Sequence, residues 1–426
     1  MAQLRLFPRF IGSLILRIII CVLVGTLLLG AVYLLPVAPM EKHLEESAQT
    51  FAEEGIYPSL YNWCTSQLDS TTDALILMIS ACDTGEDPLV QAMSGTHNTL
   101  STMETTSNEL AAHYGSGIPF DGSAPYYQYW HGYQLIIRPL LLLIGYPSMR
   151  ILNGIIQTVL LLLLCLYLQK AGLKQYILPY LVAVAMLMPV ILAKSLQYSS
   201  CYYLLTLGSL AVLWKRKELD QTDGFLFLYL GIATAYFDFL TYPIATLGIP
   251  AVFYFCIRKA DSFRNTFCRG SKICFSWGVG YLGMWSAKWF VGSLITGKNI
   301  LAEASAKLSE RSSVGEASEG LLKNMYVALS VNIKAFIRTP VLLLLLILLV
   351  ILLLSAVQHC RKHQYTIAKA TQVLFPFVVL ACLPVFWYLG TTNHSTIHHW
   401  FTNKALIVSV FAAAASLVKL KELRNP

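Results

Sequence analysis

The sequence predicts an all-α protein, a polytopic transmembrane helical bundle of about ten spans. Two observations predict it. Of the 426 residues, 56% are hydrophobic and only 13% are charged, which is the composition of a chain whose helices face lipid. The apolar residues also gather in runs of about 16 residues or more, close to the length that crosses a bilayer: 11–35, 150–168, 176–192, 198–214, 225–240, 242–257, 272–294, 340–357, 370–390 and 404–420.

Basic residues in the short loops predict the orientation of these spans. With the N-terminus inside, the strongly basic short loops all fall on the inner side, as the positive-inside rule requires: 170–174, 215–217, 258–272, 361–362 and the tail from Lys419. We therefore expect a cell-membrane protein with both termini in the cytoplasm. Most of the excess of basic residues, a formal charge of +8, lies in such loops and predicts no nucleic-acid partner.

Three stretches need separate interpretation. The first run, 11–35, is too long for the core of a signal peptide, so we expect a retained anchor. Asp238 and Pro243 divide 225–257 into two helices that meet at a turn. The stretch 133–146 is short, contains an Arg-Pro pair and would break the parity of the spans. We expect it to be a re-entrant or interfacial segment.

The spans and loops divide the chain into five parts. Two long loops are expected outside the cell, and the first of them contains a helix-like stretch, an apolar stretch and an aromatic run. The parts are an N-terminal stub with the first transmembrane helix (1–35), an outer loop with interfacial helices (36–147), a transmembrane bundle (148–294), a second outer loop (295–339), and the C-terminal transmembrane helices with a cytoplasmic tail (340–426).

The ten cysteines contain no C-x-x-C pair and no zinc-binding spacing. Only Cys64 and Cys82 fall in a predicted outer loop. An oxidising compartment would allow these two to form a disulfide.

Most histidines fall on the predicted outer side of the membrane. Ionisable groups in a bilayer protein are costly and are kept mostly where they function. A cluster on one side therefore predicts a binding or reaction site that faces out of the cell. Of the nine histidines, these seven belong to it: His43, His97, His113, His131, His394, His398 and His399.

Two carboxylates in the first outer loop are the candidate catalytic residues. Asp69 and Asp73 are four residues apart before an apolar, helix-like run, so one face of a helix that starts early enough would carry both. A carboxylate there would deprotonate an acceptor hydroxyl or hold a divalent cation, the one cofactor left open. The alternative is local, because Ser70 followed by Asp73 matches a helix-capping pattern. The two interpretations are compatible.

The outer ends of the early spans supply candidate substrate-binding residues. Arg138 lies at the membrane edge, where its planar guanidinium suits a phosphate group, although snorkelling of its side chain to the headgroups is the alternative. Arg150 and Asn153 are expected to reach the same pocket. Tyr129 and His131 precede Arg138 in the aromatic run, and Lys194 with Gln197 occupies a short outer turn where a lysine opposes the inside bias.

Two later segments complete the candidate site. Asp238 lies among large apolar side chains before Tyr242, and an unpaired carboxylate there would be costly, so pairing with Arg138 or Lys194 is the structural alternative. Asn393, His394 and His398 fill the turn before the last span. The two histidines share a helical face and would transfer a proton, contact a pyrophosphate or bind a metal. No H-E-x-x-H motif is present, so the metal is the least favoured of the three and stays unassigned.

Absent motifs narrow the choice of function. The sequence contains no Walker motif and no G-x-S-x-G elbow. No predicted span carries the regular basic residues of a voltage sensor.

The predicted topology resembles the GT-C superfamily of polytopic glycosyltransferases. The shared features are a cytoplasmic N-terminus, one span, a long outer loop that carries an acid, about ten spans and a late polar outer segment. Four segments also resemble a group of bacterial membrane proteins: Leu68–Ala74, Tyr129–Leu140, Phe237–Pro243 and Asn393–Phe401. The resemblance implies that the catalytic acid is Asp69 or Asp73, and that the phosphate of a lipid-linked sugar is held by Arg138, Lys194, His394, His398 and His399.

We therefore expect an enzyme that transfers a sugar from a polyprenyl-phosphate donor to a cell-envelope glycan or protein on the outer surface. The inner loops are short, which disfavours a cytosolic nucleotide-sugar donor. A transporter or flippase of an envelope precursor is the first alternative. Such a protein needs polar residues through the middle of the membrane, and Asp238 is the main candidate. A non-catalytic assembly subunit is the second alternative.

Overall fold

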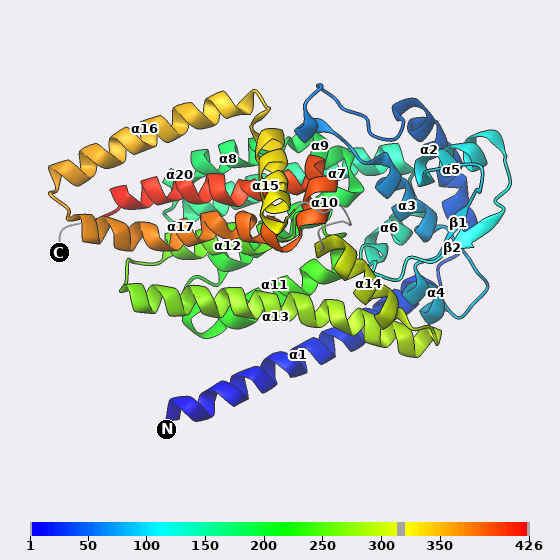
Figure 1. Ribbon diagram of the computed structural model, residues 1–426, viewed down its shortest axis with the longest axis horizontal. Helices are drawn as coiled ribbons and strands as arrows, with labels where there is room; N and C mark the ends of the chain where they lie inside the picture. Colours follow the sequence, from blue (N-terminus) through cyan, green and yellow to red (C-terminus); the bar gives the residue numbers. More distant parts are fainter. Residues whose placement is uncertain (1, 313–319, 424–426) are drawn as a thin grey trace.

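The computed structural model describes residues 2–312 and 320–423, and this part of the chain is almost entirely helical (Figure 1). The all-α class predicted from the sequence is confirmed. The described residues contain a single two-stranded antiparallel sheet, in which His97 pairs with Ala124 and Thr99 with Gly122.

Long helices lie side by side along the longest axis of the molecule, and a compact group of short elements covers one end of them (Figure 1). We call this group the outer region. It contains α2 (Ala38–Glu54), η1 (Cys64–Ser66), α3 (Ser70–Ser80), α4 (Pro88–Ser94), β1 (His97–Thr99), α5 (Thr106–Leu110), the π-helical turn η2 (Ala111–Gly115), β2 (Gly122–Ala124) and α6 (Gln134–Leu141).

The bundle is formed by α1 (Ala2–Val32), α7 (Tyr146–Lys170), η3 (Lys174–Tyr176), α8 (Ile177–Met186), α9 (Pro189–Lys194), α10 (Leu196–Trp214), α11 (Leu219–Phe237), α12 (Ile244–Ile257), α13 (Phe263–Thr296), α16 (Val341–Lys362), α17 (Ile367–Gly390) and α20 (Ile407–Lys421). The segment predicted as the second outer loop contains α14 (Ile300–Ser312) and α15 (Leu321–Ile337). The turn before α20 contains α18 (Thr392–Ile397), α19 (His399–Thr402) and η4 (Asn403–Leu406). Figure 1 shows α15 crossing the direction of the bundle helices.

Every predicted span falls on helix, but the helices differ in length. Among the described residues, five helical segments are long and apolar enough to cross a membrane: Phe10–Val32, Tyr146–Lys170, Val341–Lys362, Ile367–Gly390 and His399–Lys421. The total of about ten spans stays a prediction. One predicted run, 176–192, is broken where Met188 takes a left-handed φ of 57° before Pro189.

The helix break that Asp238 and Pro243 predict is confirmed. Helix α11 ends at Phe237 and α12 begins at Ile244, as the acid and the proline predict. Helix α6 has eight residues, about 12 Å of rise, so it does not cross a bilayer. The start of α3 differs from the predicted cap, because Asp69 rather than Ser70 is the N-cap and accepts from Thr72 N.

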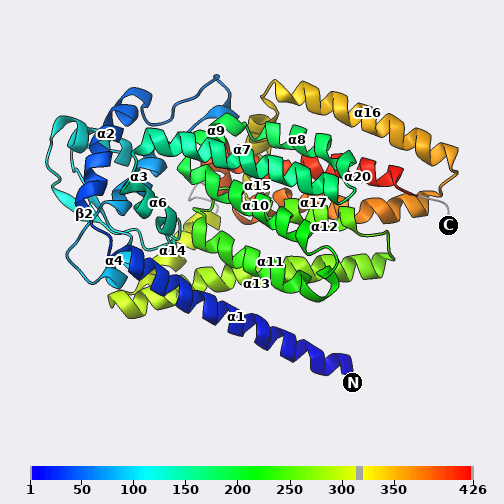
Figure 2. The same ribbon diagram turned by 180° about the vertical axis from the view of Figure 1, so that it is seen from behind.

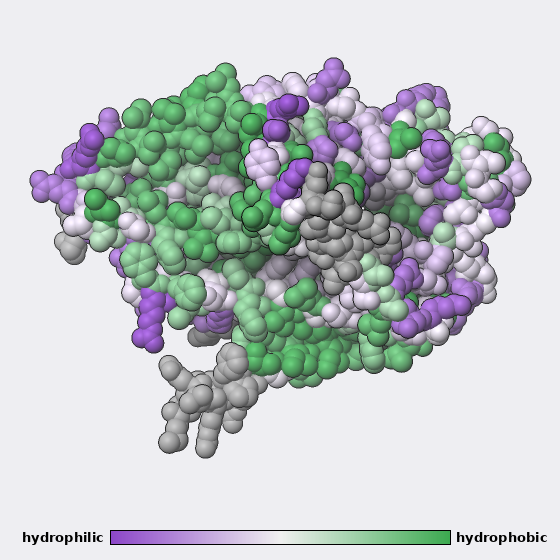
Figure 3. Space-filling model, viewed as in Figure 1, coloured by the Kyte–Doolittle hydropathy of each residue, from purple (hydrophilic) through white to green (hydrophobic). Residues whose placement is uncertain are grey.

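Apolar side chains form the surface of the bundle. Figure 3 shows them over α16 and α17 and along α13, with polar side chains at the two ends of the molecule. Many large apolar side chains on these helices are exposed, such as Leu343 at 65% and Phe290 at 57%. Such a belt is expected of helices that face lipid tails, and the chain is compatible with a membrane protein.

Small residues allow the two most closely packed helices, α11 and α13, to approach each other. A Cβ on Gly231 would lie 2.1 Å from Trp277 O, and a Cβ on Gly280 would lie 2.2 Å from Leu228 O. Both distances are far inside van der Waals contact, so only glycine permits this approach. Helix pairs in membranes commonly depend on such small residues, because burial of apolar surface gives little drive in lipid.

We expect Gly280→Val to lower the stability of the folded chain by about 1–3 kcal/mol or more, because overpacking separates α11 from α13. Gly278→Val is the matched control, since a Cβ at Gly278 meets nothing within 4 Å. Thermal unfolding of both variants in detergent measures the difference. Equal midpoints for the two variants would contradict the close packing at Gly280.

Candidate functional site

The structure separates the predicted site residues into three places. Asp69, Tyr242, His394 and His398 gather with further residues where the outer region meets the bundle. Asp73 and Arg150 lie next to them in a hydrogen-bonded network. Tyr129, His131 and Arg138 lie elsewhere in the outer region.

Asp73 fastens the outer region to the bundle. Its carboxylate accepts from Leu196 N and Gln197 N, both at 2.9 Å, and from the Tyr146 hydroxyl at 2.6 Å. Leu196 and Gln197 begin α10, so Asp73 satisfies donors that have no partner within that helix. Burial raises the pKa of Asp73, while the bonds from Tyr146 and Gln197 oppose this effect.

Arg150 extends this network to α2. Its guanidinium donates to both carboxylate oxygens of Glu54, at 2.7 and 2.8 Å, and to the Tyr146 hydroxyl at 2.7 Å. Arg138 has a different partner, the end of α1, so the two arginines do not share a contact, and a phosphate pocket that includes Asn153 stays a prediction. Asn153 donates to Ala193 O at 2.9 Å and to Ser199 Oγ at 2.7 Å.

Asp69 is a carboxylate that uses only part of its capacity to accept hydrogen bonds. Its hydrogen bonds to described residues all come from Thr72, including the backbone N–H at 3.0 Å. The side chain is buried, and burial raises its pKa to about 6. A carboxylate with this pKa is largely ionised at neutral pH yet still basic enough to accept a proton.

Two phenols lie within electrostatic reach of Asp69, and a buried lysine lies over the ring of one of them. The carboxylate of Asp69 interacts electrostatically with the hydroxyl groups of Tyr57 and Tyr198. The Tyr198 hydroxyl also donates to the backbone oxygen of Gln67, at 3.1 Å, and Gln67 precedes Asp69 by two residues. Lys404 Nζ lies 5.2 Å from the centroid of the Tyr198 ring. Lys404 is 1% exposed and donates to Thr65 O at 2.9 Å; it forms no ion pair with a described residue.

Aromatic contacts connect this group to the predicted histidines. The ring of His398 stacks on Phe401 at 5.2 Å and lies 4.8 Å from the ring of His394. Phe401 lies 5.9 Å from Tyr198, and Trp400 lies 5.3 Å from Tyr57. The predicted proximity of His394 and His398 is confirmed. We call Asp69, Tyr57, Tyr198, His398, Trp400 and Lys404 the Asp69 site.

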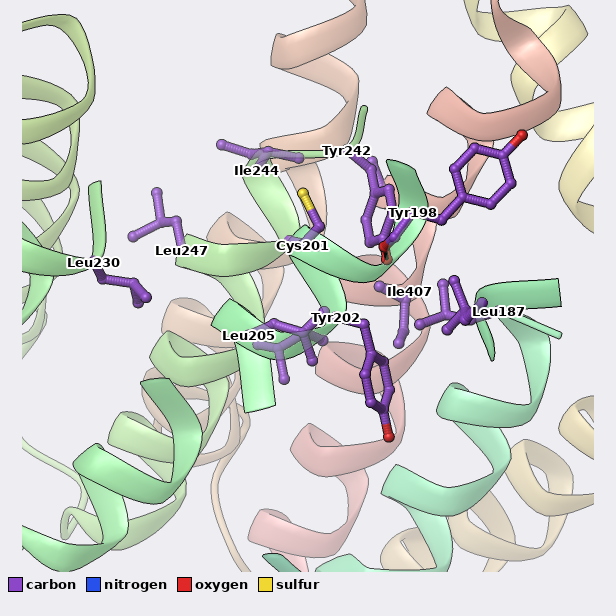
Figure 4. Close-up of a cluster of buried hydrophobic side chains, with 14 of the residues drawn as sticks. Leu187, Tyr198, Cys201, Tyr202, Leu205, Leu230, Tyr242, Ile244, Leu247 and Ile407 are labelled. Atoms are coloured by element: carbon purple, nitrogen blue, oxygen red, sulfur yellow. Dashed lines mark hydrogen bonds between the residues drawn. The ribbon is translucent and has the colours of Figure 1, made fainter. Parts of the chain in front are cut away.

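The turn between α11 and α12 supports the Asp69 site. The Tyr242 hydroxyl donates to Tyr198 O at 2.7 Å, and Figure 4 shows the side chains of Tyr242 and Tyr198 in the same buried cluster. His394 Nε2 bonds with Leu240 O at 2.8 Å. Asp238 accepts from Thr241 N at 3.0 Å and from the Thr241 hydroxyl. Its expected pairing with Arg138 or Lys194 is therefore wrong, because the turn itself satisfies the carboxylate.

His131 and Tyr129 belong to an aromatic cluster in the outer region. His131 Nδ1 bonds with the Tyr133 hydroxyl at 2.6 Å and Nε2 with Tyr126 O at 2.7 Å. Burial lowers the pKa of His131 to about 3, so the ring is neutral and both nitrogens are used. The ring of Tyr129 packs against Phe239 at 5.2 Å. These contacts give both residues a structural position.

Arg138 closes the end of α1. Its Nε donates to Val32 O at 3.0 Å, and its guanidinium lies 4.1 Å from the ring centroid of Tyr33. A cation is favourable at the C-terminus of a helix. Gln134, one turn earlier on α6, donates to Ile76 O in the middle of α3 and accepts from the Ser80 hydroxyl at the end of α3 remote from Asp69, so α6 contacts α3 beyond its first turn.

The remaining predictions have mixed outcomes. The side chain of Lys194 is half-buried and makes no hydrogen bond or ion pair with a described residue, whereas Gln197 is buried beside Asp73. Asn393 is half-buried in α18. Within residues 2–312 and 320–423, no group of three or more His, Cys, Asp or Glu side chains is arranged to hold a metal ion. The cysteines are all free, so the pairing of Cys64 with Cys82 is not formed.

The sequence interpretation missed Lys404 and Tyr198. Both were taken as part of apolar spans, although Lys404 carries a usable signal. A lysine at the outer end of a span opposes the positive-inside bias, and this one directly follows the polar turn 393–401. Tyr198 has no comparable signal, because its position beside Asp69 depends on a contact between segments far apart in the chain.

Comparison of the chain with family models, with curated proteins and with solved structures finds no match.

We expect the two acids to differ in their effect on stability. Asp73→Ala leaves the Tyr146 hydroxyl and the first N–H groups of α10 without their acceptor, a loss on the order of 2–5 kcal/mol. Asp69→Asn removes a buried charge that has few hydrogen bonds, so its thermal midpoint in detergent is expected to equal or exceed that of the wild type. A larger loss in Asp69→Asn than in Asp73→Ala would reverse these assignments.

Proposed function

We propose that this chain is a membrane glycosyltransferase of the GT-C type, which transfers a sugar from a polyprenyl-phosphate donor to an acceptor hydroxyl of the cell envelope. The observation that carries the proposal is the burial of Asp69 together with the small number of hydrogen bonds that its carboxylate accepts. Asp69 is a buried carboxylate whose pKa is raised to about 6 by burial, and its hydrogen bonds to described residues come from one neighbour. We place the site on the extracytoplasmic side, as the basic loops predict.

An apolar groove beside the site supports a lipid-linked donor. Helices α6, α7, α10 and α11, seen together in Figure 2, enclose about 380 Å³ that is lined mainly by side chains such as Ile137, Met149, Ile156 and Phe237. The first turn of α10 joins the groove to the site, because Leu196 lines the groove and Tyr198 adjoins Asp69. A polyprenyl chain in this groove would bring its phosphate to the outer end of the bundle.

In the proposed reaction, the acceptor oxygen attacks the anomeric carbon of the sugar while Asp69 takes the hydroxyl proton. The bond from the anomeric carbon to the phosphate oxygen breaks, and its electron pair leaves with the polyprenyl phosphate. Lys404 and His398 offset the charge that develops on this phosphate. Trp400 and Tyr57 offer ring faces to the sugar. Asp73 holds the scaffold around the reaction and takes no proton.

The transporter alternative is less well supported. A transport path needs polar groups through the middle of the membrane, and Asp238 was its main candidate. Because Thr241 satisfies this carboxylate within one turn, Asp238 has a structural role that requires no transported substrate.

We expect Asp69→Asn to reduce sugar transfer about 10²- to 10⁴-fold, the usual contribution of a general base. The measurement uses purified protein in liposomes, a panel of labelled polyprenyl-phosphate sugars and cell-envelope acceptors. Glu104→Gln, an exposed acid of the same outer region, is the matched control and is expected to keep wild-type transfer. Full activity in Asp69→Asn, or no transfer by folded wild-type protein with any donor, would refute the proposal.

We also expect a specific dependence on pH. Because the pKa of Asp69 is raised to about 6, the base is protonated and inactive below this value and ionised above it. The rate of transfer should therefore rise between about pH 5 and 7, with a midpoint near the pKa of the base. The residual activity of Asp69→Asn should lack this rise, and a flat wild-type profile across this interval would exclude Asp69 as the base.

A further inference from the structure

Basic residues from separate segments surround a large cavity at the end of the bundle opposite the outer region. The cavity has a volume of about 710 Å³. Arg258 and Lys259 follow α12, while Lys419 and Lys421 belong to the last turn of α20. His359 and His363 add two imidazoles from the end of α16, and Glu422 is the one carboxylate in the lining. We call this space the basic cavity.

Hydrogen bonds and ion pairs within the protein involve only some of these basic side chains. Lys419 Nζ donates to Cys256 O at 2.7 Å and pairs with Glu422 at 2.9 Å. Arg258 pairs with Asp220 at 2.7 Å. Lys259 and Lys421 are exposed and form no hydrogen bond or ion pair with a described residue. Among the described residues, two carboxylates thus meet four permanent cations, which leaves an excess of about two positive charges from this part of the chain.

The positive-inside rule explains why these residues are basic, but it does not explain why basic residues from separate segments surround one cavity. Contacts with helix C-termini explain the positions of two of these side chains. Lys419 donates to Cys256 O near the end of α12, and His359 Nε2 bonds with Leu423 O at 3.1 Å. These backbone contacts occupy Lys419 and His359. The ammonium groups of Lys259 and Lys421 remain available at the basic cavity. The orientation of the chain in a membrane does not require two such groups to lie at one cavity.

We propose that the basic cavity binds a phosphate-bearing anion at the cytoplasmic end of the bundle. Lysine ammonium groups are compact charges that suit phosphate oxygens, and basic hollows between helices on this side of a membrane hold anionic headgroups. The volume also lies in the usual range for small-ligand pockets, about 300–1,000 Å³. The phosphate comes from an anionic phospholipid or from a soluble phosphate compound. This inference does not depend on the proposed transferase activity.

The experiment compares these two sources on the full-length chain in detergent. Native mass spectrometry measures retention of phosphatidylglycerol against phosphatidylcholine, and thermal unfolding measures stabilisation by inorganic pyrophosphate. The test variant is Lys259→Ala with Lys421→Ala, which removes no internal contact of the described residues. The matched control is Lys170→Ala with Lys217→Ala, two exposed lysines outside the cavity lining.

We expect the test variant to bind the preferred probe roughly ten- to thirtyfold more weakly, from about 1 kcal/mol for each lysine near a phosphate. Loss of phosphatidylglycerol retention identifies a lipid headgroup, and loss of the pyrophosphate effect identifies a soluble phosphate compound. The proposal is overturned if the wild type retains both lipids equally and pyrophosphate gives no stabilisation. It is also overturned if the test variant binds like the wild type, or if the control variant loses as much binding as the test variant.

Discussion

The carboxylate of Asp73 at the start of α10 is the interaction on which the arrangement of this protein most depends. It joins a short helix of the outer region to the first N–H groups of a bundle helix, and Tyr146 and Arg150 extend the contact to Glu54 on α2. A buried acid is favourable only when donors replace its lost water. The N-terminus of a helix provides such donors in a fixed position. The network therefore holds the outer region in one orientation over the bundle, and the Asp69 site forms at their junction.

The same rule accounts for the different states of the two acids on α3. Asp69 and Asp73 have similar sequence neighbours, and both are buried. Asp73 accepts hydrogen bonds from two other segments, α7 and the start of α10, whereas Asp69 accepts them only from Thr72 among the described residues. The hydrogen bonds to Asp73 hold its carboxylate between segments, while the carboxylate of Asp69 has few such bonds. The proposed division of labour, with Asp73 as an anchor and Asp69 as a base, follows from the number of hydrogen bonds.

The apolar interior of the bundle imposes the second constraint, because it offers no hydrogen bonds to an unpaired polar group. Polar residues that interrupt the bundle are accordingly satisfied close to their own position, as Asp238 is by Thr241. Helices α11 and α13 pack through glycine, since burial of apolar surface between helices gives little drive in a bilayer. Uncompensated charge is left to the two ends of the molecule, where the Asp69 site and the basic cavity lie.

The sequence by itself determined the helical class, the positions of the apolar helices, the break between Phe237 and Ile244, and the shortness of α6. These features depend on hydrophobic runs and on proline or charged residues within a few positions, so local composition is sufficient. The tertiary structure decided which charged residues share a site. Arg138 was predicted beside a phosphate but lies against the end of α1, and Lys404 was overlooked although it adjoins Tyr198. The partners of Asp73 and Arg138 are chosen by packing between segments that are 100 residues or more apart, as with Asp73 and Gln197, and no local pattern in the sequence contains that information.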